Sequence, residues 1–476
     1  MKKNLRFRLL MLLLIVCTFP VLTGFEANYT TDEDGKTHPL PLCYVPVRVM
    51  NQMDAETGAF SFPQDLFYAP NGLLYVCDTG NKRVVSMTTG GEVVKVYTNP
   101  NGGGFKAPNG VFVDEDGDLY VADTDAACVV HVSPNDEFVE KFVQPDSVLY
   151  DSIYPFRPTK VMIDKIGQLY ILNKEDYHGL IVMDALGEFK GYTATSRLPF
   201  DLASYIATFI ATENQQARMA KRVPPVNSNF FIDEENTLYT TSIMAKTEQL
   251  KRYSVAGINI YPKTDAFGIT APDAMMRHMD KQLEQVRFTD VYVDAAGIVT
   301  MLENASGRLY QYDRSGNLLT IFGGAGNWAG RFSGAVSLTG DADGNLYVLD
   351  STQGSIHVFE PTYFIETVHH ALDLFYEGRY EESITPWEEV LRLDANYTIA
   401  HAGLGKAYLK QEKWVEAMAE YRIAGDKDGY SAAFDSWSRE VLQNYFGWIV
   451  LAIVAVIAAA AVFITQMKKL YWKLNP

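Results

Sequence analysis

Four oxygen-bearing side chains occupy equivalent places in a phrase that recurs along the chain. The phrase reads Gly-x-Leu-Tyr-Val-x-Asp, with Ile and Asn substituted in one copy, and its copies end at Asp78, Asp123, Asn173 and Asp350. Carboxylate and amide oxygens are the ligands that hard cations such as calcium prefer. If the copies converge on one axis, these four residues are candidate metal ligands in a central channel.

The same four residues also have a structural interpretation, which we favour. A carboxylate at the end of a strand accepts hydrogen bonds from nearby backbone N–H groups and fixes the following turn. Two weaker copies place Ser242 and Glu303 at this point, so every copy offers an oxygen there. A polar position shared by all copies is a poor description of an asymmetric metal site, so we predict no cofactor.

Other residues offer little chemistry. His131, His178 and His357 lie in separate copies of the repeat, without metal-ligand spacing and without a paired nucleophile. We interpret each of them as a solvated or structurally satisfied histidine, and we predict that the protein is not an enzyme.

The recurring phrase predicts the elements that position these side chains. Its first three copies are 45 and 50 residues apart, which is typical of the four-stranded blades of a β-propeller. Six copies are present, so we predict a mainly β fold, a six-bladed β-propeller over residues 44–361. The last copy has only three expected strands. We predict that Tyr44–Val49, which alternates with period two, completes that blade and closes the ring, with Pro46 on an outer edge.

One insertion interrupts the propeller pattern between the third and fourth copies. Within residues 201–222, apolar residues recur at helical spacing and cations fall in the last turn. We expect a helix packed against a propeller face; a partner-binding or channel-capping element is the alternative.

A helical module follows the propeller over residues 362–440. A spacing of 34 residues relates Ser383 to Ala417 and Trp387 to Tyr421, as in tetratricopeptide repeats. A third helix, over residues 431–444, is expected to cap the pair. Tetratricopeptide units have no chemistry of their own and present grooves to peptides or helices.

Both ends of the chain carry membrane signals. Residues 1–24 combine basic residues with an apolar stretch, as in an export signal. Residues 445–467 lack charge and are long enough to span a bilayer, and Lys468, Lys469 and Lys473 lie in the tail, 468–476. Because positive charge stays cytoplasmic, we expect a single-pass protein of the cell membrane, with its N-terminal domains outside and its C-terminus in the cytoplasm. The net charge of -17 argues against nucleic-acid partners.

The blade phrase resembles the NHL repeat of six-bladed propellers. The run Asn81-Lys82-Arg83-Val84 matches that repeat's signature, and the resemblance extends over about Phe62 to Phe359. The whole arrangement resembles a family of membrane-anchored proteins from Gram-positive bacteria whose members are often encoded beside sugar ABC transporters. The resemblance implies an accessory role in carbohydrate uptake or sensing.

We therefore predict a membrane-anchored scaffold that binds a protein partner, such as a transporter or its solute-binding component. Two alternatives stay open. NHL propellers are similar to gluconolactonase-like hydrolases, which implies metal-dependent lactone hydrolysis with calcium held by the four strand-end residues. The third interpretation is a propeller that binds a carbohydrate directly.

Overall fold

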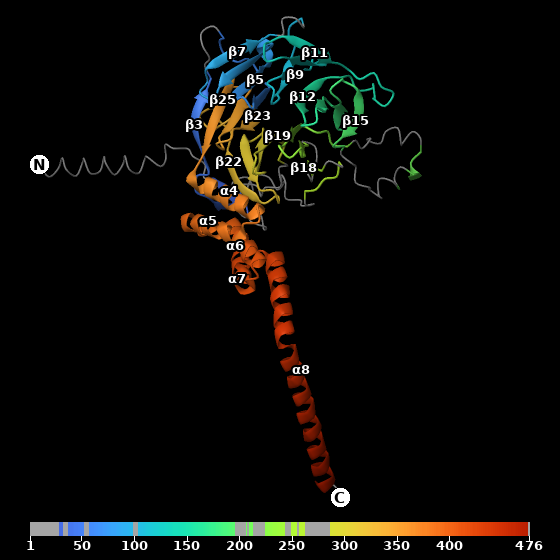
Figure 1. Ribbon diagram of the computed structural model, residues 1–476, viewed down its shortest axis with the longest axis vertical. Coiled ribbons are helices and arrows are strands. Elements are labelled where there is room, and N and C mark those ends of the chain that lie inside the picture. Colours follow the sequence, from blue (N-terminus) through green and yellow to red (C-terminus); the bar gives the residue numbers. More distant parts are fainter. Residues whose placement is uncertain are drawn as a thin grey trace, which may run out of the picture. The chain divides into compact units, whose positions relative to one another are not determined.

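The computed structural model describes residues 28–31, 37–51, 57–98, 103–195, 206, 209–212, 224–242, 249–254, 257–261 and 286–474. The chain divides into two compact units, residues 1–366 and 367–476, of which the first is the β unit. Among the described residues, six antiparallel sheets surround one axis as the blades of a propeller (Figure 1). The predicted fold class is confirmed. The export signal and most of the insertion at 201–222 lie outside the described residues.

Each blade is a meander whose first strand is innermost. Blade 1 comprises β4 (Asp65–Tyr68), β5 (Leu73–Asp78), β6 (Arg83–Thr88) and β7 (Val93–Tyr97). Blade 2 comprises β8 (Pro108–Val113), β9 (Leu119–Asp123), β10 (Cys128–Val132) and β11 (Phe138–Phe142). Blade 3 comprises β12 (Pro158–Ile163), β13 (Leu169–Asn173), β14 (Leu180–Met183) and β15 (Phe189–Thr193). Blade 4 comprises β16 (Asn229–Ile232), β17 (Leu238–Thr241) and β18 (Leu250–Tyr253), and blade 5 comprises β19 (Phe288–Val293), β20 (Val299–Glu303), β21 (Arg308–Tyr312) and β22 (Leu318–Gly323). Blade 6 comprises β23 (Ala335–Gly340), β24 (Leu346–Asp350), β25 (Ser355–Pro361) and β3 (Tyr44–Met50).

In five of the six blades, the turn between the first two strands begins with an Asp that accepts backbone hydrogen bonds. In blade 2, Asp114 Oδ1 accepts hydrogen bonds from the N–H groups of Asp116 and Asp118, at 3.1 and 2.8 Å, and Gly117 takes the left-handed conformation with φ 86°. In blade 4, Asn236 replaces the glycine with φ 63°. Asn tolerates this conformation better than most residues, which explains why the weaker copy keeps the same turn.

The N-terminal strand β3 closes the ring as predicted. It pairs with β25, and Pro46 lies opposite Phe359 on the outer edge of blade 6, next to an irregularity in the ladder. Its first residue anchors it to blade 5, because the Tyr44 ring stacks on Phe322 with centroids 4.6 Å apart and the Tyr44 hydroxyl accepts a 3.0 Å hydrogen bond from Gln311. Closure thus joins strands from opposite ends of the propeller sequence.

The hairpin of β1 (Tyr29–Thr31) and β2 (Thr37–Pro39) is a feature that the sequence analysis did not predict. It extends blade 5 to six strands by pairing with the outer edge of β22, where Tyr29 lies opposite Ile321. Thr30 Oγ1 also donates to the Leu318 carbonyl at 3.1 Å. The N-terminal segment therefore covers one sheet edge and completes another.

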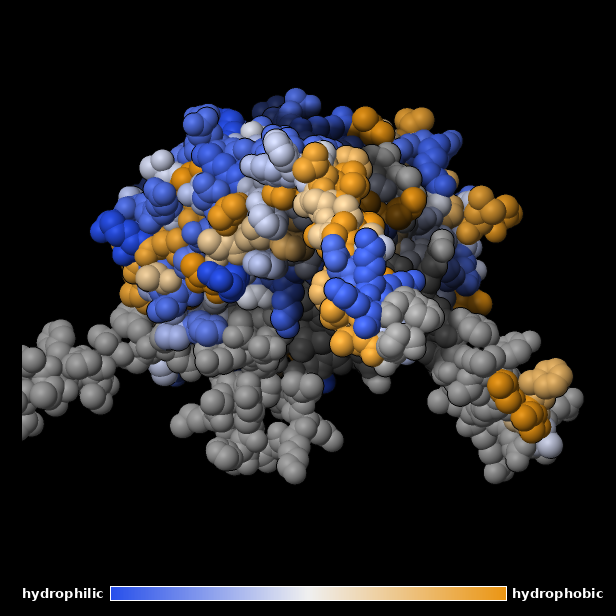
Figure 2. Space-filling model, turned by 90° about the horizontal axis from the view of Figure 1, so that it is seen from below, coloured by the Kyte–Doolittle hydropathy of each residue, from blue (hydrophilic) through white to orange (hydrophobic). Residues whose placement is uncertain are grey.

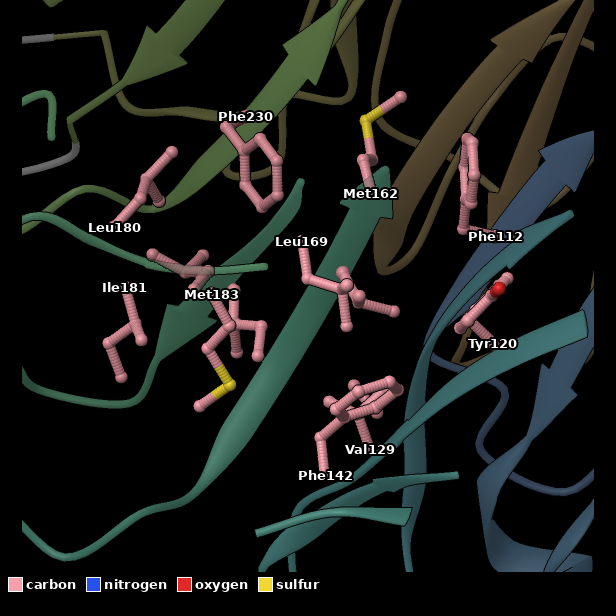
Figure 3. Packing of buried hydrophobic residues seen from close by; sticks show 14 of the residues in the cluster. Phe112, Tyr120, Val129, Phe142, Met162, Leu169, Leu180, Ile181, Met183 and Phe230 are labelled. Carbon is pink, nitrogen blue, oxygen red and sulfur yellow. The ribbon is translucent and has the colours of Figure 1, made fainter. Parts of the chain in front are cut away.

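Apolar side chains fill the spaces between blades. A large buried cluster joins blades 2, 3 and 4, and Figure 3 shows three of its members, Phe112, Met162 and Phe230, on three inner strands. Burial of such side chains is worth about 1.5–3 kcal/mol each, so the interfaces between blades are the core of this unit.

The second unit is helical apart from its loops. Its elements are α4 (Tyr363–Tyr376), which begins before the boundary, α5 (Tyr380–Leu393), α6 (Thr398–Lys410), α7 (Trp414–Ala424) and α8 (Lys427–Leu474). The helices pair antiparallel with close approaches, since a Cβ placed on Gly405 would lie 2.9 Å from the Tyr421 ring. This is the packing of tetratricopeptide repeats that the 34-residue spacing predicts.

Helix α8 is 48 residues long, about 70 Å at 1.5 Å per residue. Among the described residues it is the one helix long and apolar enough to cross a membrane. Figure 2 looks along it from the C-terminal end and shows hydrophobic side chains over the helix with hydrophilic ones at the near end.

Candidate functional site

The strand-end residues named from the sequence lie on one side of the propeller, which we call the front face: the inner strands begin there and the second strands end there. Each residue binds its own blade. Asp78 accepts hydrogen bonds from the Ser61 N–H at 2.7 Å, from Asn81 at 2.8 Å and from Arg83 Nε at 2.8 Å. Asp123 accepts from the N–H groups of residues 106, 107 and 126, at 2.7, 2.8 and 3.2 Å.

The remaining copies act in the same way. Asn173 Oδ1 accepts from the Arg157 N–H at 2.6 Å, and Asp350 Oδ2 accepts from the Ser333 N–H at 2.6 Å. In blade 5, Glu303 accepts from the two N–H groups of the turn that follows it, at 3.0 and 2.7 Å. In blade 4, Ser242 Oγ donates to a neighbouring asparagine of its own blade at 3.3 Å. The strand-end side chains thus form hydrogen bonds to the loop before the inner strand, to the turn after the second strand, or to both.

These oxygens therefore face backbone donors within separate blades and do not share a point in space. Over the described ranges, no three His, Cys, Asp or Glu side chains gather as a metal site would require. The donor set is already used by N–H groups, so the geometry does not fit a shared calcium ion. The metal assignment from the sequence stays a prediction that this geometry does not favour.

The hydroxyl that follows the carboxylate ties neighbouring blades together. Thr79 Oγ1 donates to the Pro108 carbonyl of blade 2 at 2.5 Å, and Thr124 Oγ1 donates to the Pro158 carbonyl of blade 3 at 2.6 Å. At the ring closure, Gln64 Nε2 donates to Ser351 Oγ at 3.1 Å. In this repeated pair, the carboxylate forms hydrogen bonds within its own blade, and the hydroxyl that follows it forms a hydrogen bond to the next blade.

A second set of residues, which the sequence analysis missed, lies at the centre. Every inner strand contributes one residue at the same position of its ladder. This residue pairs with the residue of the second strand that directly precedes the strand-end residue. We call these six the channel ring: Asp65, Gly110, Lys160, Asn229, Asp290 and Ser337. Three of the six carry charge in strands that are otherwise largely buried and apolar, and this contrast is the signal that could have revealed them.

One half of the channel ring is built around Asp65. Its Oδ1 accepts from Lys160 Nζ at 2.8 Å and from Ser337 Oγ at 2.9 Å, and its Oδ2 accepts from the Val111 N–H at 2.9 Å. Four blades meet in these three bonds. Gly110 allows the approach, because a Cβ there would lie 2.5 Å from the backbone of β12.

The other half is built around Asp290. Its Oδ1 accepts from Asn229 Nδ2 at 2.6 Å, and its Oδ2 accepts from the Leu338 N–H at 2.7 Å. Burial raises the pKa of Asp290 to about 6, the Lys160 charge opposes that rise, and the Asp65 charge adds to it. Burial alone would lower the pKa of Lys160, but the two carboxylates outweigh it and hold that pKa above its usual value.

An apolar layer lies directly behind the channel ring, two residues further along the inner strands. Phe67 and Phe112 have ring centroids 5.1 Å apart, and Phe231 and Tyr292 have theirs 5.5 Å apart. Met162 lies beside Phe112 in this layer (Figure 3), and blade 6 contributes the buried Thr339 at the same level. The Lys160, Asp65 and Asp290 side chains are thus enclosed by packed side chains and are nearly inaccessible to solvent. The arrangement can lock blades together; it does not present a reactive group to a substrate.

The histidines divide into buried and half-exposed ones. His357 is fully buried: its Nδ1 accepts from the Gly330 N–H at 3.2 Å, so the ring proton lies on Nε2, 3.2 Å from Ser355 Oγ. Burial lowers the pKa of His357 to about 4. This ring donates to the serine and does not act as its base. His178 is half-exposed, with Nδ1 2.8 Å from the buried Asp176 carboxylate.

Two family models match parts of this chain. The NHL repeat matches residues 60–85, and the TPR repeat matches residues 371–412. Both repeat predictions are thereby confirmed for these segments. A search of curated proteins finds no match.

Solved propellers resemble the chain at low identity. A streptogramin B lyase is 10% identical, covering 67% of this chain and 98% of its own, with a TM-score of 0.43. A catalytically inactive virginiamycin B lyase from Staphylococcus aureus with quinupristin is 11% identical, covering 72% and 97%, with a TM-score of 0.40. A gluconolactonase from Xanthomonas campestris is 11% identical, covering 72% and 99%, with a TM-score of 0.42. Likeness at this level supplies no argument about activity.

Proposed function

We propose that this chain is a membrane-anchored binding protein whose propeller holds a protein partner on its front face. The observation that carries the proposal is a set of large apolar side chains exposed on the loops that lead into the inner strands. Phe62 precedes blade 1, Leu149 and Ile153 precede blade 3, and Trp328 precedes blade 6, and each is more than half exposed. Two of the four, Phe62 and Trp328, are aromatic, and aromatic side chains are enriched at protein interfaces.

The closed centre of the propeller supports binding over catalysis. The charged members of the channel ring are paired and buried, so the described residues at the axis offer no free charged group to a substrate. Within that surface Trp328 is the strongest candidate for a binding hot spot, because Trp side chains in interface centres contribute more than most others.

The helical unit and α8 complete the proposal. Tetratricopeptide pairs present grooves for peptides or helices, which gives the chain a second binding module. We infer that the apolar part of α8 spans the membrane, since residues 445–467 would measure about 35 Å against a hydrocarbon core of about 30 Å. The lysines that follow support a cytoplasmic C-terminus, with both modules outside, because positive charge stays cytoplasmic. The partner we propose, by resemblance, is a carbohydrate transporter or its solute-binding component.

Cross-linking in intact membranes tests the partner. Parent chain and Trp328→Ala are compared after lysine-reactive cross-linking, and the neighbours are identified. We expect a specific neighbour with the parent chain and much less of it with Trp328→Ala. Leu186→Ala is the matched control, because Leu186 is also highly exposed but lies in the β14–β15 turn, on the opposite face. Equal recovery from all three proteins would refute a front-face interface.

Lactone hydrolysis is tested separately. Purified full-length protein in detergent is assayed on sugar lactones with and without calcium, and Asp123→Ala is compared. Activity that requires calcium and is lost in this variant, while the fold is retained by circular dichroism, would replace the binding proposal with the hydrolase. A panel of sugars in thermal-shift measurements tests direct carbohydrate binding, because a ligand of the folded state raises Tm.

A further inference from the structure

Helix α8 carries a continuous apolar stripe before it reaches the proposed membrane span. Tyr430, Phe434, Trp437, Val441 and Tyr445 follow one another at steps of three and four residues, so they lie on one face. Tyr430, Phe434 and Tyr445 are exposed by 38, 44 and 56%. The Phe434 and Trp437 rings touch, with centroids 5.7 Å apart. We call this face the stripe.

The stripe borders the face by which α8 packs in its own repeat module. That second face is formed by Gly429 and Ala433, which meet α7: Ala433 is fully buried beside Ala417 and Tyr421, and a Cβ on Gly429 would lie 2.5 Å from the Tyr421 ring. The fold of the helical unit therefore already uses one side of α8 and leaves aromatic side chains exposed on another.

The stripe continues into the apolar segment with a change of residue size. Trp448 is the next member, and Ala452, Ala455 and Ala459 follow at the same steps, all exposed. In water, aromatic side chains on a helix face gain from burial. In lipid, where no hydrophobic force acts between helices, small residues favour association because they let the backbones approach closely. One face is thus suited to a helix neighbour on both sides of the bilayer surface.

We propose that the stripe pairs with the stripe of a second copy of this chain, α8 parallel to α8. The helix that occupies the stripe must enter the lipid at the same depth as α8. It must contact the aromatic residues outside the bilayer and pack closely against the alanines within it. A second copy meets this requirement by identity, because insertion fixes the same orientation and the same depth for both chains. A parallel pair related by a two-fold axis brings each residue near its own counterpart.

The charges on α8 agree with self-pairing. Like charges meet in a parallel homodimer wherever a charged residue borders the interface. Between Tyr430 and Trp448 the stripe itself is uncharged, and the positions beside it on one flank are Ser431 and Ser438. On the other flank, Glu440 is occupied as the acceptor of the Trp414 indole N–H. Self-pairing through the stripe therefore meets no row of facing like charges.

Single-cysteine cross-linking in membranes tests this proposal, which rests on the membrane insertion proposed above. Val441→Cys places a thiol on the stripe, and Leu442→Cys, one residue on, places it about 100° around the helix. Both are made in the full-length chain, whose native Cys43, Cys77 and Cys128 are buried and whose Cys17 lies in the expected export signal, so the parent chain sets the background. After mild oxidation of the membrane fraction, we expect most of the Val441→Cys chain at twice the monomer mass and Leu442→Cys at the parent background. Adding Phe434→Ser to Val441→Cys should reduce the dimer several-fold.

The outcomes separate the two proposals. A membrane-bound chain that shows no dimer, or equal dimer at both positions, overturns self-pairing and leaves the anchor intact. A cross-linked product of a different mass shows that another helix occupies the stripe and also overturns it. A chain found outside the membrane fraction refutes the anchor and, with it, the pairing.

Discussion

Removing the amine of the channel ring should destabilise the propeller strongly. Lys160→Met replaces the buried ammonium, bound 2.8 Å from Asp65 Oδ1, with an apolar side chain of similar length. Both carboxylates of the channel ring then stay buried without their cation. Breaking a buried ion pair from one side costs about 3–5 kcal/mol, because the partner charge is left uncompensated.

The stability lost in Lys160→Met should depend on pH, and the titration of Asp290 decides whether the loss is larger at low or at high pH. Its pKa of about 6 in the folded protein lies above the ordinary 3.8, so between about pH 4 and pH 6 the folded state holds a proton that the unfolded state releases. The contribution of Asp290 to stability therefore falls as pH rises from about 4 through 6. Lys160 holds this pKa down, so in Lys160→Met it should rise further. At about pH 5 the folded variant relieves part of its cost by binding a proton at Asp290, whereas at about pH 7.5 it largely does not. For each unit by which the Asp290 pKa rises, the stability lost in Lys160→Met should therefore be smaller at about pH 5 than at about pH 7.5 by up to about 1.4 kcal/mol.

Urea unfolding of the full-length protein in detergent, followed by near-ultraviolet circular dichroism at both pH values, measures the effect. Arg157→Met is the matched control, because Arg157 leads into the same inner strand as Lys160 and its 3.0 Å pair with Asp125 of blade 2 is exposed and should contribute less than about 1 kcal/mol. The reasoning is refuted if Lys160→Met costs no more than Arg157→Met, or if its cost is the same at both pH values.

Three further predictions concern folding. Asp123→Ala should cost about 3 kcal/mol in urea unfolding, because three backbone N–H groups lose their acceptor; an unchanged midpoint would contradict the structural role. Tyr44→Ala should cost about 3–5 kcal/mol through the closing strand, whereas Tyr44→Phe, which keeps the ring, should cost about 1 kcal/mol; equal losses would refute the stacking account. Gly403→Ala should lower Tm through a clash, since its Cβ would lie 2.5 Å from the Trp387 ring, while Gly447→Ala, with open space around it, should not; a neutral Gly403→Ala would contradict the packing.

The repeat was readable because its signals are local. A strand, a turn with Asp at its start and Gly or Asn at its end, and the next strand lie within about a dozen residues, so periodicity and turn chemistry report them directly. The closing strand was also predictable, since the last copy lacked a strand and Tyr44–Val49 alternated. The hairpin of β1 and β2 was not, because two strands of three residues carry too little pattern.

Part of the candidate site could also be predicted from local patterns, and part could not. Asp78 and Asp123 were found because they end a repeated phrase, yet the partners that tie them to the loop before the inner strand lie 16 or 17 residues earlier in the chain. The channel ring escaped notice because Asp65 and Lys160 are 95 residues apart, and nothing local relates them.

The sequence by itself determined the six-bladed propeller, its closing strand, the tetratricopeptide pair and one long apolar helix, because each depends on periodicity over neighbouring residues. Only the tertiary structure decided that the centre is closed by a paired charge network and that the strand-end carboxylates bind backbone donors of their own blades. The physical reason is that ring closure brings inner strands from distant repeats within hydrogen-bond distance, and such contacts leave no periodic trace in the chain.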